Sequence, residues 1–342
     1  MKSNASLPRS DEDFTALMTG LFAELPDSIW AQDGLRRGIW DTALLDPARD
    51  MLSRSGKGVR SMLLRRAWEL SGGKADGPPE LLLVLIELLH AGSLIIDDIE
   101  DDSQIRRGRP ALHRLHGLPL ALNTGNWLYF LALAVLARSG QSPDVRLALY
   151  EDVSMALMRC HQGQALDLSV RVTDLRRAEV SELVATSTRL KTGSLMELAA
   201  TLGARSAEAP ADQVVTMSAF GAELGVALQM LDDWSGIRLE ARREKGREDV
   251  RHGRLTWPWA WLATIDDDVG YKQTVRQAQE ISIDWEADRV LERLRVLLAP
   301  VARIRIQGQL AKALDGLSSG LGEGQDLSGI RSDMAELEQA YG

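Results

Sequence analysis

The chain has 342 residues, of which 45% are hydrophobic and 26% are charged, the ordinary balance of a globular protein with a sizeable buried core. Its 49 acidic residues against 40 basic ones give a net charge of -9, which argues against binding nucleic acid through broad neutralisation of phosphates. The single cysteine, Cys160, excludes a disulfide framework or a cysteine-built metal site within one chain. It fits a reducing compartment, so we expect a cytoplasmic protein.

The first residues, MKSNASLPRSDED, carry acids and lack an apolar core, so they do not have the pattern of a secretory signal or an organellar presequence. We expect the mature protein to begin here, with residues 1–10 disordered. The longest apolar stretch, from Leu81 to Ile96, contains Glu87 and His90 and is followed at once by acids. It is therefore predicted to be a buried helix, and no transmembrane segment is expected.

Apolar residues recur at intervals of three and four through most of the chain, and runs of alternating β-branched residues are absent, which predicts helices throughout. The predicted helical segments are 44–70, 81–99, 118–136, 145–168, 180–202, 214–231 and 290–314. Glycine and proline separate them, as expected for connections between helices. The sequence therefore predicts one all-α domain, a large helical bundle over residues 11–315. We expect residues 316–342 to form a flexible, glycine- and serine-rich segment followed by a short C-terminal helix.

Five carboxylates occur within the six residues from Asp97 to Asp102, at the end of the apolar segment. Asp97 and Asp101 are four residues apart and share one face of a helix, with Asp98 next to them. Like charges at this spacing repel unless a cation lies between them, and carboxylate oxygens without histidine or cysteine suit Mg²⁺ that also binds substrate phosphate. A solvated acidic helix end is the alternative. The preceding Leu94–Ile96 pulls the base of the acids into the core, which favours a metal site.

Basic residues lie on both sides of this acidic run. Arg106, Arg107 and Arg109 follow it, and guanidinium groups chelate phosphate oxygens as a fork, although simple neutralisation of the acids is the alternative. Upstream, residues 55–60 form a glycine-flexed basic turn with Lys57 and Arg60. Its spacing is not that of a P-loop, and by itself a surface helix start is the simpler explanation of this turn.

A second acidic pair, Asp232 and Asp233, also ends an apolar helix, the segment 220–231. Lys245, Asp249 and Arg254 follow it. Two apolar helices that each end in an acidic pair predict a clamp for a metal–diphosphate complex if they face each other across one cavity.

Taken together, these motifs resemble those of the trans-isoprenyl diphosphate synthase (polyprenyl synthetase) family, the head-to-tail prenyltransferases, in order from Ser55 to Trp261. The stretch from Glu87 to Gly108 is similar to the first aspartate-rich motif of that family. Segments 123–131, 162–167 and 191–193 are most similar to its geranylgeranyl branch. The resemblance implies a helical bundle of the isoprenoid synthase type with a central apolar cavity, and a homodimer.

The resemblance also implies roles for individual residues. Asp97 and Asp101 would bind Mg²⁺ on one side of an allylic diphosphate, with Asp98 completing the motif, and Asp232 would hold a further ion, giving about three ions per active site. The residues implied in binding the allylic diphosphate are Arg106, Lys191 and Lys245. Those implied in binding isopentenyl diphosphate are Lys57, Arg60, His90 and Arg107. Thr192 and Gln229 would lie along the path of the carbocation, and Arg254 stands at a substrate-binding position where the family usually has lysine.

The sequence departs from the family pattern at Gly236 and in its run of tryptophans, and two further positions bear on the chain length of the product. Gly236 stands where the second motif of the family has its third acid, and the close run Trp257, Trp259 and Trp261 is more typical of packing than of chemistry, although aromatic faces also stabilise cations. In the family, a bulky aromatic four or five residues before the first aspartate stops growth at short chains. Ser93 and Gly92 occupy these positions here, which predicts geranylgeranyl diphosphate or a longer product. The alternative is that Gly92 only permits close helix packing.

The expected reaction begins with ionisation of the allylic C–O bond, as Mg²⁺ and basic residues draw charge onto the diphosphate. The isopentenyl double bond attacks the cation inside a cavity that excludes water, and loss of a proton leaves a chain one isoprene unit longer. One alternative is a class I terpene cyclase on the same scaffold, which has no use for an isopentenyl diphosphate pocket. The other is a noncatalytic helical partner that modulates a synthase.

Overall fold

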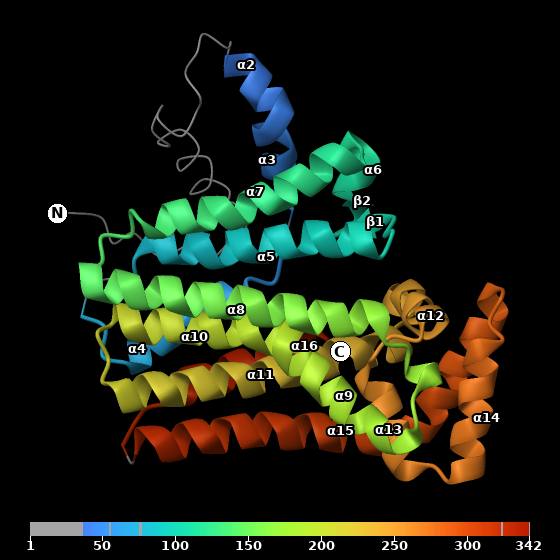
Figure 1. Cartoon of the computed structure of the whole chain (residues 1–342). Helices are drawn as coiled ribbons and strands as arrows, with labels where there is room; N and C mark the ends of the chain where they lie inside the picture. Colours follow the sequence, from blue (N-terminus) through green and yellow to red (C-terminus); the bar gives the residue numbers. More distant parts are fainter. Residues whose placement is uncertain (1–36, 55, 75–76, 323, 342) are drawn as a thin grey trace. The chain divides into compact units, whose positions relative to one another are not determined.

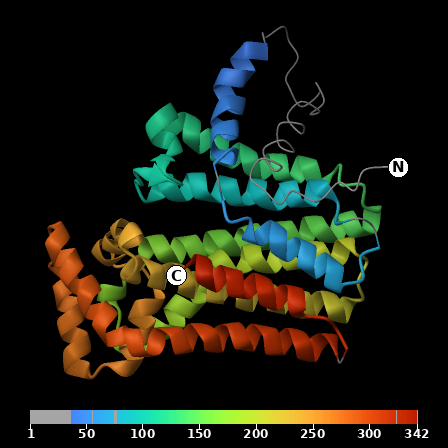
Figure 2. The ribbon, with the colours of Figure 1, turned by 180° about the vertical axis from the view of Figure 1, so that it is seen from behind.

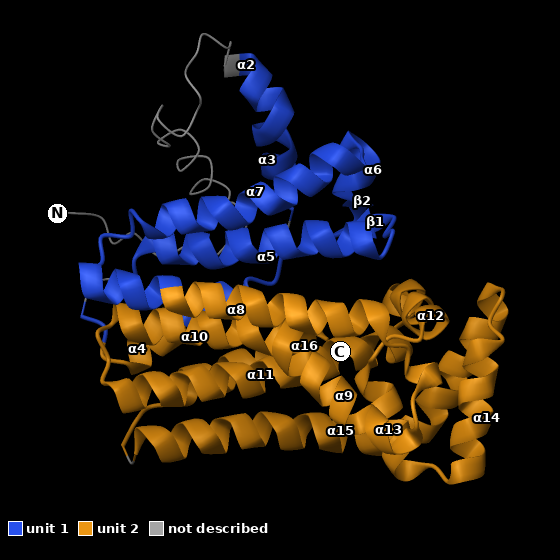
Figure 3. Cartoon of the chain, in the orientation of Figure 1, with its two compact units in different colours: residues 1–65, 73–150 blue, residues 66–72, 151–342 orange. Residues whose placement is uncertain are grey.

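The computed structural model of the chain describes residues 37–54, 56–74, 77–322 and 324–341. It divides into two compact units (Figure 3), unit 1 comprising Met1–Arg65 and Gly73–Tyr150, and unit 2 comprising Arg66–Gly72 and Glu151–Gly342. Helices make up nearly all the regular structure of the described residues, so the predicted all-α class is confirmed. The expected disorder of residues 1–10 lies outside the described residues, as does Ser55.

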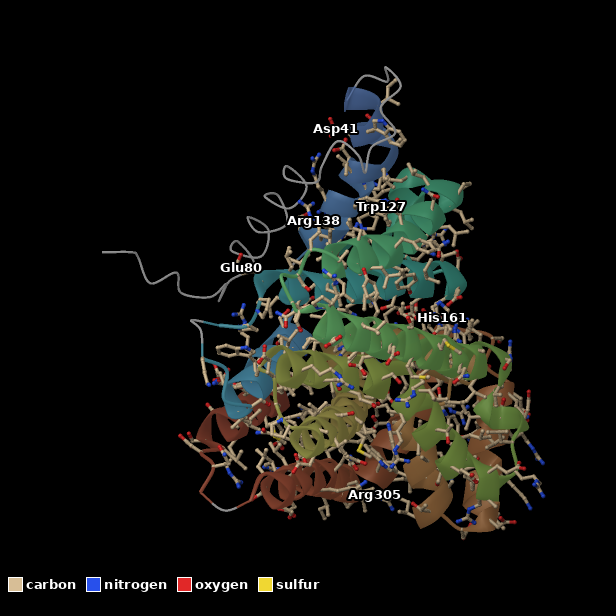
Figure 4. The ribbon with its side chains drawn as sticks, turned by 60° about the vertical axis from the view of Figure 1, so that its left-hand side comes forward. Asp41, Glu80, Trp127, Arg138, His161 and Arg305 are labelled. Atoms are coloured by element: carbon tan, nitrogen blue, oxygen red, sulfur yellow. The ribbon has the colours of Figure 1, made fainter. Side chains whose placement is uncertain are left out.

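Unit 1 is built around two apolar helices, α5 and α7, which lie side by side (Figure 1). Glu80 at the start of α5 and Arg138 just beyond α7 lie at one end of this pair (Figure 4), so the two helices are antiparallel. At the other end, a two-stranded hairpin with Arg106 paired to Arg109 leads from α5 towards α7. The elements are α2 (Arg37–Trp40), η2 (Asp41–Leu45), α3 (Asp46–Leu52), α5 (Glu80–Glu100), β1 (Ile105–Arg106), β2 (Arg109–Pro110), α6 (Leu112–His116) and α7 (Leu118–Leu136).

Unit 2 is centred on the long helix α11, which packs against both α10 and α15, while α9 packs against α13 (Figures 1 and 2). Two helices, α4 (Val59–Leu70) and α8 (Pro143–Ser169), contain residues of both units. The other elements of unit 2 are η3 (Val172–Asp174), α9 (Arg177–Thr188), η4 (Arg189–Gly193), α10 (Ser194–Ser206), α11 (Ala211–Arg238), η5 (Glu240–Arg242), α12 (Arg243–His252), α13 (Trp257–Ile265), α14 (Asp268–Gln279), α15 (Asp284–Leu321) and α16 (Ser328–Ala340).

Glycines let the principal helices approach closely within each unit. In unit 1, a Cβ added at Gly92 of α5 would lie 2.9 Å from the carbonyl oxygen of Gly125 on α7 and 3.2 Å from the Tyr129 ring. In unit 2, a Cβ at Gly225 of α11 would lie 2.8 Å from the Cα of Gly193. These distances are shorter than real Cβ contacts, so any larger residue would push the helices apart. Gly92 therefore has the packing role that was the alternative to a chain-length role.

Two predicted helical boundaries are wrong. The predicted helix 44–70 is interrupted between α3 and α4, where Gly58 has a left-handed φ of 57° that ordinary side chains rarely adopt. The C-terminal flexible segment was predicted from Gly316 onwards, yet α15 continues to Leu321. Gly320 is a packing residue there, because a Cβ would overlap the side chain of Thr216 on α11. Glycine content suggested flexibility where it serves close contact.

By length and composition alone, α7 and α11 are apolar enough to cross a membrane, a test that the core helix of a globular fold also passes. Of the apolar window of α11, 61% is buried inside the structure, against 39% for α7. The apolar side chains of α11 are therefore mostly used in packing. The predicted buried helix 81–96 forms most of α5, and its apolar residues are almost all buried, as expected.

Candidate active site

The first acidic group ends α5, and its two adjacent aspartates point in different directions. Asp98 is 1% exposed, and its Oδ1 accepts hydrogen bonds from Arg106 Nε at 2.8 Å and Nη2 at 2.5 Å. The Asp97 side chain is 21% exposed, with Oδ2 3.6 Å from Arg106 Nη2. Neighbouring residues of a helix differ by about 100° in direction, so one carboxylate turns inward and the other outward. Asp98, predicted among the catalytic residues, is here a buried anchor for Arg106.

The electrostatics of this pair follow from burial. Burial raises the pKa of Asp98, although the hydrogen bonds from Arg106 oppose that shift. Burial also disfavours the charged form of Arg106, but its contacts with Asp98 and the charges of Asp97 and Asp101 raise its pKa on balance. Asp98 Oδ2 is buried without a hydrogen-bond partner. Arg106 therefore keeps its charge beside Asp97 and Asp101, as a phosphate-binding role requires.

The glycine-flexed turn before α4 receives Arg107 from the hairpin. Arg107 Nη1 donates to the carbonyl oxygen of Arg54 at 2.9 Å, and a Cβ added at Gly56 would lie 2.9 Å from Arg107 Nη2. Arg54 in return donates from Nη1 to the carbonyl oxygen of Arg106 at 3.1 Å. The Arg54 side chain is fully buried and pairs with Asp50 at 3.3 Å, and Asp50 also binds Arg109 at 2.8 Å. Sequence reasoning missed Asp50 and Arg54, which hold the two basic segments together.

His90 lies on α5 among three of the predicted substrate-binding arginines. Burial, followed by the charges of Arg60, Arg107 and Arg106, lowers the pKa of His90 well below its ordinary value. Its Nδ1 is buried without a hydrogen-bond partner. A neutral imidazole surrounded by guanidinium groups provides a setting for an anion. Lys57, which is also implied in binding isopentenyl diphosphate, is exposed on the turn before α4.

The second acidic group, in unit 2, centres on Asp232 at the end of α11. Its carboxylate pairs with Lys245 of α12 and with Arg242 Nη1, the latter at 2.7 Å. Burial opposes ionisation of Asp232, but the charges of Lys245 and Arg242 outweigh it and hold its pKa well below the usual range. Arg242, which sequence reasoning missed, also donates to the Ser235 hydroxyl at 2.5 Å. Asp232 is therefore ionised and forms ion pairs with two cations.

Asp233 is a buried structural acid. Its Oδ1 accepts from Gln229 Nε2 at 2.7 Å, and its Oδ2 accepts from the backbone N–H of Trp257 at 2.9 Å. Gln229 Oε1 in turn accepts from the Thr192 hydroxyl at 2.6 Å. Burial raises the pKa of Asp233 to about 6. The acid fixes the orientation of the Gln229 amide and so holds Thr192, and the structure brings these two predicted residues into contact.

Lys191 and Thr192 belong to η4, a single π-helical turn between α9 and α10. Such turns occur mostly as bulges within α-helices and are frequent at functional sites. Lys191 Nζ pairs with Asp167 of α8 at 2.9 Å, and Arg254 Nη1 donates to the Asp167 carbonyl oxygen at 2.9 Å. A Cβ added at Gly163 of α8 would lie 2.5 Å from the backbone nitrogen of Lys191, so this glycine permits the approach. Continuous helical periodicity hid the bulge from sequence reasoning.

Asp249 and Gly236 complete the second group. Burial raises the pKa of Asp249 to about 7, with Lys245, Asp233, Asp232 and Asp167 as its charged neighbours. Gly236 packs against the backbone of Gly246 on α12, where an added Cβ would lie 3.5 Å from the Gly246 Cα. The position of the third acid is therefore occupied by a close helix crossing.

The tryptophan run packs in the core, as its spacing predicts. Trp259 and Trp261 are fully buried, and Trp261 lies 6.2 Å from Trp234 and 6.5 Å from Trp257 between ring centroids. Trp257 is half-buried, and its backbone is the one bound to Asp233. This cluster fixes the start of α13 beside the second acidic group.

The donors suited to a metal are carboxylate oxygens that face outward, namely Asp97 and Asp101 in unit 1 and Asp232 in unit 2. Over the described residues, no group of three or more acidic, histidine or cysteine side chains is arranged to enclose an ion by itself. In proteins, Mg²⁺ is usually bound through one or two carboxylates together with waters and substrate phosphate.

Comparison with known proteins agrees with these observations. Residues 41–281 match the model of the polyprenyl synthetase family. A geranylgeranyl pyrophosphate synthase from Eremothecium gossypii is 29% identical, covering 75% of this chain and 83% of the relative. A short chain isoprenyl diphosphate synthase from Methanothermobacter thermautotrophicus is 31% identical, covering 66% and 70%. The crystal structure of heptaprenyl diphosphate synthase from Staphylococcus aureus superposes with a TM-score of 0.74 at 20% identity, covering 96% and 99%. The chain belongs to the polyprenyl synthetase family and is a prenyltransferase.

Proposed function

We propose that this prenyltransferase condenses an allylic diphosphate with isopentenyl diphosphate, head to tail. The observation that carries the proposal is the basic cluster around His90 in unit 1, to which Arg60 and Arg107 contribute the charges implied in binding isopentenyl diphosphate. A cyclase ionises one diphosphate and needs no such second anion pocket. The cluster favours a synthase because it collects guanidinium groups around a neutral ring with an unpaired nitrogen.

Mg²⁺ is the proposed cofactor, held by Asp97 and Asp101 at the end of α5 and by Asp232 at the end of α11, with about three ions in all. When bound, these ions neutralise charge on the departing diphosphate. Arg106, Lys191 and Lys245 add fixed positive charge in the same role. Lys245 is well suited to it, because the neighbouring aspartates raise its pKa above the ordinary value despite burial.

Thr192 and Gln229 are proposed to lie beside the developing carbocation. The Thr192 hydroxyl donates a hydrogen bond to Gln229 Oε1, and Gln229 Nε2 donates one to Asp233 Oδ1. The donor and acceptor roles of these three side chains are therefore fixed. The lone pairs of Thr192 Oγ1 are therefore left for the cation. Positioned oxygen lone pairs stabilise positive charge without reacting as a nucleophile would.

The test is an assay of the purified chain with Mg²⁺ and each allylic diphosphate, with and without isopentenyl diphosphate. We expect longer prenyl diphosphates only when both substrates are present. Release of diphosphate from the allylic substrate alone, with a hydrocarbon product, would establish a cyclase instead. A chain that releases no diphosphate under either condition would be the noncatalytic partner.

The proposed product is geranylgeranyl diphosphate or a longer chain. Ser93, four residues before Asp97, is half-buried and small, and its hydroxyl donates to the His90 carbonyl oxygen at 2.8 Å. A small side chain there leaves room for a growing tail on the face of α5 that bears Asp97. Gly92 supports the proposal less, since the space at its Cβ is taken by α7.

We also propose a cytoplasmic homodimer. Leu118, Leu122 and Phe130 share one face of α7 and are 52%, 38% and 69% exposed, a stripe of apolar surface suited to another copy of the chain. Analytical ultracentrifugation of wild type and of Phe130→Glu tests it. A wild type that sediments as a monomer contradicts the dimer. Cell fractionation tests the compartment.

A further inference from the structure

Arg242 is placed as a binding residue that neither the acidic motifs nor their known basic partners include. It ends η5, the short connection between α11 and α12. Its Nη1 is shared between Asp232 at 2.7 Å and Ser235 at 2.5 Å, and its side chain is 30% exposed. In the described part of the chain, Nε and Nη2 make no hydrogen bond. These two nitrogens form the side-on fork with which arginine binds a pair of phosphate oxygens.

The other face of this guanidinium rests on the end of the C-terminal helix. The Cζ of Arg242 lies 5.7 Å from the centre of the Tyr341 ring, within cation–π range. Arg238 Nη2 also donates to the Tyr341 carbonyl oxygen at 3.4 Å. Tyr341 therefore contacts two arginines near the second acidic group.

The helix that directly precedes Tyr341, α16, is itself anchored within unit 2. Asp333 of α16 binds Arg66 through two hydrogen bonds, from Nε at 2.6 Å and from Nη2 at 3.2 Å. The apolar face of α16 is buried through Ile330, Met334 and Leu337. The Tyr341 ring thus limits the rotamers of Arg242, so that less side-chain entropy is lost when this guanidinium binds an anion.

Charge around Asp232 supports the same conclusion. Lys245 and Arg242 both pair with this one outward carboxylate, while Asp233 is saturated by Gln229 and Trp257. The third acid that would offset the second cation is absent at Gly236. Two cations therefore pair with one outward carboxylate, and a diphosphate is the anion that the proposed reaction supplies.

We propose that Arg242 binds the diphosphate on the Asp232 side and that Tyr341 is a positioning residue that holds its guanidinium there. The inference rests on the proposed function, because it assigns a contact to the same diphosphate. It adds a role for the C-terminal helix, which the acidic motifs do not reach in sequence.

The test is calorimetric titration of the metal-loaded protein with inorganic pyrophosphate, a readout that does not depend on turnover. Arg242→Ala should weaken binding about tenfold to a hundredfold, the effect of losing a charge-assisted contact. Tyr341→Leu should weaken it about two- to fivefold by loss of the cation–π contact, and Tyr341→Phe, which keeps the ring, should restore it. Arg295→Ala is the matched control, since Arg295 pairs with Glu292 on the surface of α15.

In steady-state assays, Arg242→Ala should raise the KM for the allylic substrate and leave that for isopentenyl diphosphate unchanged. Wild-type affinity for pyrophosphate in Arg242→Ala would overturn the binding role. Equal affinities for pyrophosphate in Tyr341→Leu and Tyr341→Phe would overturn the positioning role. Circular dichroism of the two variants is the control that both are folded. If the wild type binds pyrophosphate but never joins the two substrates, the proposed function fails while the role of Arg242 stays testable.

Discussion

The two acidic pairs, Asp97–Asp98 in unit 1 and Asp232–Asp233 in unit 2, look alike in sequence and divide their work in the same way. In each pair the first aspartate faces cations near the surface and the second is buried, with Asp98 1% and Asp233 5% exposed. The buried member holds a neighbour in place: Asp98 holds Arg106, and Asp233 holds Gln229. A pair of adjacent acids at a helix end thus supplies one outward carboxylate and one internal anchor.

The pairs differ in how completely the anchor is satisfied. Asp98 has one partner and one oxygen without a hydrogen bond, whereas both oxygens of Asp233 are bound. The cation beside the first pair comes from the next hairpin, while the second pair recruits Lys245 and Arg242 from the segment after α11. The buried acid of the second group is therefore the more completely hydrogen-bonded of the two.

The largest expected effect separates the two members of the second pair. Asp232→Ala should lower kcat by about 10²-fold or more, since it removes a proposed metal ligand from the charge-stabilising cluster. Asp233→Asn should mainly destabilise, because both partners of Asp233 are donors and the new amide N–H would face one of them, at about 1–3 kcal/mol. Steady-state kinetics and thermal melts of both variants measure the loss of kcat and the loss of stability separately. Full activity in Asp232→Ala would contradict it, and Asp97→Ala and Asp101→Ala should behave as Asp232→Ala does.

A smaller effect distinguishes the basic residues of the two units. Arg60→Ala should raise the KM for isopentenyl diphosphate, and Lys191→Ala that for the allylic substrate, each by about tenfold to a hundredfold. The reason is that Arg60 lies in the cluster around His90, whereas Lys191 lies in the second acidic group. Steady-state assays varying one substrate at a time check this. If both variants affect the same substrate, the assignment of the two anion pockets is wrong.

Gly236 on α11 and Gly246 on α12, which pack against each other beside Asp232 and Asp233, provide a matched set of variants. A Cβ at Gly246 would overlap the carbonyl oxygen of Gly236, while a Cβ at Gly236 would make ordinary contact at 3.5 Å. Gly246→Ala should therefore cost about 1–3 kcal/mol of stability, and Gly236→Ala should cost much less. Gly236→Asp should change the rate only modestly. Thermal melts decide the first point, and a large rate gain in Gly236→Asp would show that the second motif is impaired without its third acid.

The pH dependence of stability tests the buried acid of α12. Asp249 has a pKa of about 7 when folded, against an ordinary value of about 4 when unfolded. Between these values the folded state keeps a proton that the unfolded state releases, so stability falls as pH rises, and the deficit is complete above about pH 7. The Tm advantage of Asp249→Asn over wild type, measured in EDTA, should grow from about pH 5 to about pH 8. The exposed Asp315→Asn should show no such trend, and a constant advantage would refute the assignment.

The smallest expected change concerns the product and leaves the first condensation intact. Ser93→Phe should shorten the product by filling the face of α5 below Asp97 without touching the metal ligands. Gly92→Phe is the poorer test, because the carbonyl oxygen of Gly125 leaves no room for its Cβ. Product chromatography compares Ser93→Phe with Ser93→Ala. An unchanged product distribution would show that a residue other than Ser93 limits the chain length, and Tyr129 is the aromatic that lies beside Gly92.

Much of the candidate site followed from local spacing. Acids four residues apart after an apolar run, and basic residues within two turns of them, predict a metal–diphosphate site because helical periodicity acts over a few residues. The same local reasoning failed at the predicted helix 44–70, where the turn before α4 interrupts it, and at Gly316, where α15 continues. Glycine marks both a turn and a close contact, and the sequence alone does not distinguish them.

By itself, the sequence determined the all-α class and the two acidic pairs and predicted most of the candidate site residues, since each depends on side-chain type and short-range spacing. The tertiary structure decided which aspartate of each pair turns inward, why Gly92, Gly163 and Gly246 are glycine, and which distant residues hold the site. Arg54 with the hairpin and Arg242 with Tyr341 are pairs that meet only after the chain has folded back on itself. The physical reason is that a hydrogen bond or ion pair depends on where packing brings the chain, which local periodicity does not encode.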